Sequence, residues 1–71
     1  MKPIYRISRD GEFITDSVGA TRALETLDSY GVIGAARCGG RLADMRRRET
    51  AEFVAAPGLG DTAIIRVDRL A

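Results

Sequence analysis

Residues 16–31 read D-S-V-G-A-T-R-A-L-E-T-L-D-S-Y-G, and this stretch decides the fold class. Its apolar side chains recur at helical spacing and fall on one face, while polar side chains cover the other face. The apolar set consists of Ala20, Ala23, Leu24, Leu27 and Tyr30. We therefore predict an amphipathic helix over residues 17–30. Asp16 or Ser17 is expected to cap it, because a short side-chain oxygen there accepts a free backbone N–H. Gly31 is expected to end it, because glycine adopts the left-handed conformation at little steric cost.

Residues 3–15 predict a β-hairpin before this helix. Asp10 and Gly11 suit its two-residue turn, since a type I′ turn requires a positive φ at both central positions. Working outward from that turn, the expected cross-strand pairs are Arg9 with Glu12, Ser8 with Phe13, and Ile7 with Ile14.

The segment after the helix is harder to assign. Residues 32–37 are short and apolar and predict a strand, followed by a turn at residues 38–40. Residues 41–56 are rich in helix formers and carry opposite charges at i,i+4 spacing, which favours a second helix. The alternative is two strands, over residues 41–46 and 50–56, joined by a turn at residues 47–49. Residues 57–61 predict a loop, and the alternation over residues 62–70 predicts a final strand.

These elements predict a small α+β domain that comprises the single compact unit 1–71. A mainly antiparallel sheet of three to five short strands would pack on the helix at 17–30, with a possible second helix at 41–56. A chain of this length buries only a thin core, so association into a homodimer is a second possibility.

The composition argues against several kinds of chemistry. The chain contains no histidine and one cysteine, which excludes Ser–His and Cys–His nucleophiles, histidine metal sites and an internal disulfide. No glycine pattern marks a nucleotide-binding loop. We therefore expect a protein that is not an enzyme and that uses no cofactor or metal. No apolar run approaches the roughly 20 residues of a membrane span, and no secretory signal is present. A cytoplasmic protein without a membrane partner is expected.

Charge supplies two candidate binding surfaces. The segment 37–48 holds five arginines against Asp44 alone, and this basic patch consists of Arg37, Arg41, Arg46, Arg47 and Arg48. Such a patch can contact phosphates, dock an acidic protein, or be a solvated face neutralised by Asp44, Glu49 and Glu52. An acidic helix face is the second candidate, formed by Asp16, Glu25 and Asp28. Carboxylates along a helix can imitate phosphates and occupy a groove meant for nucleic acid.

Two further features concern association. Cys38 lies between arginines and beside two glycines, where an accessible thiol could form an intermolecular disulfide. The alternative is a small, half-buried residue. Apolar residues of the outer strands could form a second apolar face that awaits a partner, as in a subunit of a larger assembly. These residues are Ile4, Phe13, Ile64 and Leu70.

As a whole, the chain resembles the anti-CRISPR proteins, which are small inhibitors encoded by phages and mobile elements. The resemblance rests on a short chain without histidine, an acidic helix and the Arg46-Arg47-Arg48 patch. It implies a compact cytoplasmic α+β protein without catalytic residues that blocks a nucleic-acid-guided host defence complex. The partner would then be a protein or nucleoprotein complex. The alternative function is a small nucleic-acid-binding regulatory module that uses the arginines of residues 37–48.

Overall fold

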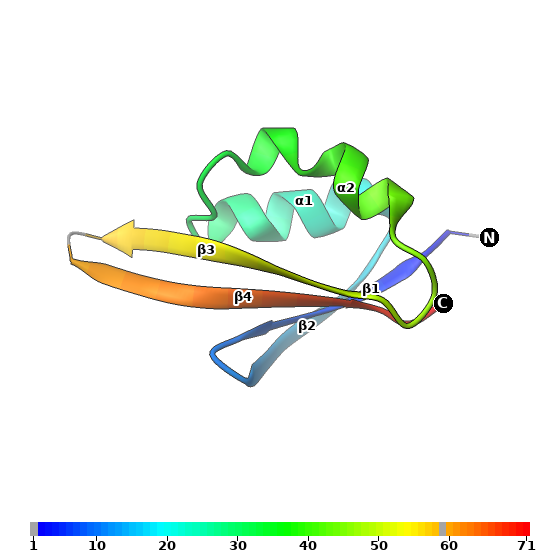
Figure 1. Ribbon diagram of the computed structural model, residues 1–71, viewed down its shortest axis with the longest axis horizontal. Coiled ribbons are helices and arrows are strands. Elements are labelled where there is room, and N and C mark those ends of the chain that lie inside the picture. Colours follow the sequence, from blue (N-terminus) through cyan, green and yellow to red (C-terminus); the bar gives the residue numbers. More distant parts are fainter. Residues whose placement is uncertain (1, 59) are drawn as a thin grey trace.

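Figure 1 shows the computed structural model, which describes residues 2–58 and 60–71. The chain forms β1 (Ile4–Arg9), β2 (Glu12–Val18), α1 (Ala20–Ser29), a short 3-10 helix η1 (Ala35–Arg37), α2 (Gly39–Asp44), β3 (Thr50–Gly58) and β4 (Asp61–Arg69). The strands form one antiparallel sheet in the order β2-β1-β4-β3, and both α-helices cover the same face of it. The predicted α+β class, with a small antiparallel sheet packed on the amphipathic helix, is confirmed.

The first hairpin forms where the sequence predicted it. Asp10 and Gly11 have φ values of 48° and 88°, as a type I′ turn requires. The predicted pairs of Arg9 with Glu12 and of Ser8 with Phe13 are present. The third predicted pair is wrong, because a bulge follows and Ile7 lies opposite Thr15 instead of Ile14. The extra residue, Ile14, packs against the core.

Helix α1 begins later than predicted, at Ala20. Asp16 and Ser17 are not its cap, because both continue β2, where Asp16 pairs with Arg6 and Ser17 lies buried opposite Tyr5. The chain turns into the helix at Gly19 instead, whose φ is 87°. The predicted end is confirmed: the helix stops at Ser29, Tyr30 follows it, and Gly31 has a φ of 79°.

Two predictions for the middle of the chain are wrong. Residues 32–37 form no strand among the described residues; Val32 makes one isolated bridge to Ala55, and Gly34 turns the chain with a φ of 70° into η1. The long helix at 41–56 is absent as well. α2 starts at Gly39, inside the predicted turn, and ends at Asp44, so the predicted strand at 41–46 is also wrong.

The second half of that segment is strand β3, as the alternative interpretation proposed. β3 pairs with β4 over most of its length, and its alternating residues Ala51 and Ala55 are buried beneath the helices. Burial along a two-stranded ladder outweighs a few exposed i,i+4 charge pairs, each worth about 0.2–0.5 kcal/mol. The strand runs to Gly58 and β4 begins at Asp61, so the predicted loop is shorter, and its residue Leu59 lies outside the described residues.

The core lies between the sheet and the two helices. Its largest fully buried side chains are Tyr5, Ile7, Leu27, Leu42, Ile65 and Val67. The Tyr5 hydroxyl donates a 2.7 Å hydrogen bond to the backbone carbonyl of Leu42, which joins β1 to α2. In the part of the chain that the structure describes, no helix is long and apolar enough to cross a membrane.

Candidate functional site

The loop between α2 and β3 is fastened to the end of β4. The backbone N–H of Arg48 donates to the Arg69 carbonyl at 2.7 Å, and the Arg69 N–H donates to the Glu49 carbonyl at 3.0 Å. The Arg69 guanidinium also donates a hydrogen bond to the Met45 carbonyl. These bonds fix the backbone that carries Arg46, Arg47 and Arg48.

Arg48 occupies an unfavourable backbone conformation within this loop. The Glu49 N–H donates to the Arg46 carbonyl at 3.0 Å, which closes a β-turn with Arg47 and Arg48 at its centre. Arg48 has a φ of 71°, a left-handed value that residues with a Cβ rarely adopt. The conformation persists because the hydrogen bonds of the loop hold it. Such strain is found preferentially at functional sites.

The three arginines of the turn are exposed, and none of them forms a salt bridge with another described residue. The two ion pairs found among the described residues join Arg6 to Asp16 at 2.9 Å and Arg66 to Asp68 at 3.1 Å. The expected neutralisation of Arg46–Arg48 by Asp44, Glu49 and Glu52 is therefore not seen in these residues.

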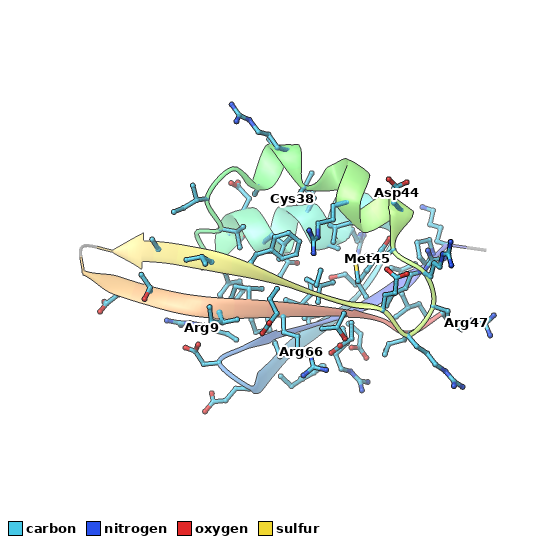
Figure 2. All side chains as sticks on the ribbon, viewed as in Figure 1. Arg9, Cys38, Asp44, Met45, Arg47 and Arg66 are labelled. Atoms are coloured by element: carbon cyan, nitrogen blue, oxygen red, sulfur yellow. The ribbon has the colours of Figure 1, made fainter. Side chains whose placement is uncertain are left out.

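The structure brings further basic residues to this end of the molecule. Lys2, Arg22 and Arg69 line one hollow, and Arg69 in turn holds the loop that carries Arg46–Arg48. Both chain termini lie at the same end of the sheet as this loop (Figure 1), and Arg47 is at its extremity (Figure 2). We call this surface the basic end. It consists of the exposed cations Lys2, Arg22, Arg46, Arg47 and Arg48, whereas Arg69 is half-buried and bound to the Met45 carbonyl.

Lys2 and Arg22 were missed by the sequence interpretation because they are distant in sequence from the arginine cluster. One signal for Arg22 was available. It lies in the first turn of α1, which contains no acidic residue, although the helix dipole favours acidic side chains there.

The other two arginines of the predicted patch lie elsewhere. The Arg41 guanidinium lies over the Phe53 ring, 5.7 Å from its centroid, on the side of β3. Arg37 ends η1, one residue before Cys38, which Figure 2 shows over the middle of the molecule and away from Arg47. The predicted patch is therefore divided into the turn at Arg46–Arg48 and two separate arginines.

The charge of the molecule is uneven from end to end. Three acidic residues accompany the basic end: Glu25 lines the same hollow as Lys2 and Arg22, and Asp44 and Glu49 flank Arg46–Arg48 in the sequence. The hairpin turns lie away from the basic end (Figure 1) and carry Asp10, Glu12 and Asp61 against Arg9. The field of the protein therefore favours the approach of an anion to the basic end.

The predicted acidic helix face loses one of its members. Asp16 lies on β2, not on the helix, and the bidentate hydrogen bond from Arg6 lowers the pKa of its carboxyl group. Glu25 and Asp28 are exposed on α1 as expected. Two separate carboxylates are a weak imitation of a phosphate backbone.

The predicted second apolar face is interrupted. Phe13 and Ile64 are exposed on the sheet and Leu70 directly after β4, at 63%, 42% and 39% of their full accessibility, and Ile4 is half-buried. A ladder of charged residues crosses the same outer face between them. Asp16 pairs with Arg6, Arg6 lies opposite Asp68, and Arg66 lies opposite Glu52. The apolar residues therefore form separate spots around a charged centre.

Cys38 is half-buried, and its thiol is 3.6 Å from the Gly34 carbonyl, to which it donates. This position matches the structural alternative for the residue, and an intermolecular disulfide stays a prediction. In the described ranges, no three His, Cys, Asp or Glu side chains come together as possible metal ligands.

Among the described residues, the basic end thus brings together exposed cationic side chains from separate elements. Comparison with known proteins finds no relative of the chain: no protein-family model, no curated protein and no solved structure matches it.

Proposed function

We propose that this protein is a non-catalytic binding protein that docks on a larger macromolecular partner through its basic end. The observation that carries the proposal is the turn at Arg46–Arg48. Three exposed arginines, which form no ion pair among the described residues, are held on a hydrogen-bonded backbone, and one of them is strained. Arginines held on an ordered backbone lose less entropy on binding than arginines on a mobile tail.

The resemblance to anti-CRISPR proteins specifies the partner in this proposal. It is a nucleic-acid-guided host defence complex, which presents both protein and nucleic-acid surfaces and which the protein would inhibit by occupying one of them. The same surface serves the alternative function, a small nucleic-acid-binding regulatory module, because both functions require an anionic partner for the basic end.

A capture experiment with reversed charges tests the proposal. Tagged protein is incubated with bacterial lysate, with and without nuclease, and the wild type is compared with Arg46→Glu/Arg47→Glu and with Glu25→Arg/Asp28→Arg. We expect reversal at the basic end to abolish capture of the partner and reversal on α1 to leave it unchanged. Capture that survives the first pair of changes and is lost with the second would show that the docking surface is the helix.

A functional readout tests the inhibitor form of the proposal. Cleavage of target DNA by reconstituted nucleic-acid-guided effector complexes is measured with increasing amounts of the protein. Inhibition by the wild type and by Glu25→Arg/Asp28→Arg, but not by Arg46→Glu/Arg47→Glu, is expected. Captured protein that leaves cleavage by its effector unchanged would contradict inhibition and leave docking in place.

A further inference from the structure

We infer that the basic end binds the phosphate backbone of a nucleic-acid duplex, without reading its sequence. This inference rests on the proposed function and names the chemistry of its partner. The kind of cation present favours phosphate as the ligand. Four of the five residues of the basic end are arginines, whose planar guanidinium matches the geometry of phosphate oxygens and can donate two hydrogen bonds at once.

The cations of the basic end come from three separate parts of the fold. Lys2 precedes β1, Arg22 lies in the first turn of α1, and Arg46–Arg48 occupy the loop before β3. The positive end of the α1 dipole adds to their potential. A surface with several separated cations suits a row of phosphates better than a single small anion. Each phosphate that such a surface neutralises releases counterions from the duplex.

The placement of the aromatic residues favours a duplex over a single strand. The chain has four, Tyr5, Phe13, Tyr30 and Phe53, and none is on the basic end. Tyr5 is buried, and Phe53 lies beneath Arg41. Phe13 is near the first hairpin turn, and Tyr30 follows the last turn of α1. Proteins that bind single strands stack bases on aromatic side chains, so this surface is suited to a paired duplex, whose bases stay stacked.

The conformation of Arg48 also supports a role in binding an anion. A glycine or asparagine would occupy this position of the turn with less strain. Arginine at this position costs conformational energy and places a third consecutive cation in the turn. Binding of an anion by the turn would explain why a strained arginine occupies this position.

The test measures binding to a fluorescein-labelled 20-base-pair DNA duplex by fluorescence anisotropy between 50 and 200 mM KCl. We expect a dissociation constant within the range of about 10⁻⁴–10⁻⁶ M at physiological salt, as for other binding that does not depend on sequence. A plot of log K against log salt should be linear, with a slope no steeper than about −4.5 if all five cations each neutralise one phosphate.

Two double variants separate the structural grouping of the arginines from their grouping in the sequence. Arg46→Ala/Arg47→Ala removes two cations of the basic end and should make the salt slope less steep by about 1.8. Arg37→Ala/Arg41→Ala makes the same change in net charge outside the basic end and should leave the slope unchanged. Circular dichroism and thermal melts confirm that both variants are folded. Equal effects of the two variants, or a wild-type slope near zero, would overturn the inference.

Competitors identify the partner chemistry. A second duplex of scrambled sequence should compete as well as the first, and a single strand of the same length should compete less well. Tighter binding of the single strand would overturn the assignment to duplex. Poly-glutamate that competes as well as duplex at equal charge would indicate an acidic protein partner. That result would overturn the inference but not the proposed function, provided that Arg46→Glu/Arg47→Glu still abolishes capture of a nuclease-resistant partner.

Discussion

Asp10 and Ile64 join the two hairpins of the sheet through a pair of hydrogen bonds. The backbone N–H of Asp10 donates to the Ile64 carbonyl at 2.9 Å, and the Ile64 N–H donates to the Asp10 carboxylate at 2.9 Å. Arg9 is the last residue of β1 that pairs with β4. The carboxylate of Asp10 continues the β1–β4 hydrogen-bond ladder one residue further. Asp10 has a φ of 48°, a conformation that aspartate and asparagine tolerate better than most residues.

Replacing Asp10 separates its two roles in the turn. We expect Asp10→Ala to lower the free energy of unfolding by about 1–2 kcal/mol, since the variant loses the acceptor for Ile64 and the tolerance of a positive φ. Asp10→Asn keeps a side-chain oxygen and the tolerance, and should stay within about 0.5 kcal/mol of the wild type. Urea denaturation measures both. Equal losses in the two variants would mean that the negative charge is what matters.

The hydrogen bond from Tyr5 to α2 can be removed without changing the shape of the ring. Tyr5→Phe should lower the free energy of unfolding by about 1 kcal/mol, because the Leu42 carbonyl then loses one of its two donors among the described residues and keeps the Met45 N–H. Tyr30→Phe serves as the control, since no hydrogen bond from the Tyr30 hydroxyl is found among the described residues, and it should change stability little. Thermal and urea unfolding report both values. A Tyr5→Phe variant as stable as the wild type would contradict this role.

Features that depend on neighbouring residues were predictable from the sequence. Asp10-Gly11 specifies its turn because both residues accept a positive φ, and Gly31 ends α1 for the same reason. The apolar spacing of α1 also predicts the face that it buries, through Ala23 and Leu27.

Features that depend on distant partners were not predictable in this way. The segment that begins at Thr50 has good helix propensity, and it becomes a strand because β4, about ten residues later, offers a ladder and a buried face. Asp16 could have capped a helix, but Arg6 across the hairpin gives it an ion pair instead. The bulge that places Ile7 opposite Thr15 contains no glycine from which the sequence could predict it.

The candidate site shows the same division. Arg46–Arg48 are conspicuous in the sequence, and the structure keeps them together and exposed. Their association with Lys2 and Arg22 depends on Arg69, which joins the loop to the end of β4, and no spacing in the sequence reveals this contact. Grouping by sequence instead placed Arg37 and Arg41 in the patch.

Two substitutions at Arg48 distinguish its charge from its backbone strain. Arg48→Ala and Arg48→Gly remove the same charge, but only glycine adopts a φ of 71° without a clash at Cβ. We expect Arg48→Gly to be more stable than Arg48→Ala by about 1 kcal/mol, and both to bind duplex DNA with a salt slope that is less steep by about 0.9. Urea denaturation and anisotropy measure the two effects. Equal stability of the variants would show that the loop relaxes and that Arg48 is not strained.

The ion pair between Asp16 and Arg6 gives a prediction for acid conditions. The hydrogen bond from Arg6 lowers the pKa of Asp16 below its ordinary value of 3.8, so the folded protein binds a proton there less readily than the unfolded chain. The stabilisation is therefore complete above the unfolded-state pKa and is lost as the pH falls through the lower folded-state pKa. Asp16→Asn should remove this part of the pH dependence of the free energy of unfolding below about pH 4. Asp28→Asn is the control and should retain it, because Asp28 has no ion pair among the described residues. The effect should weaken in 1 M NaCl, because the pair is exposed. Urea denaturation from pH 2.5 to pH 6 measures it, and identical curves for wild type and Asp16→Asn would show that the pair contributes nothing to stability.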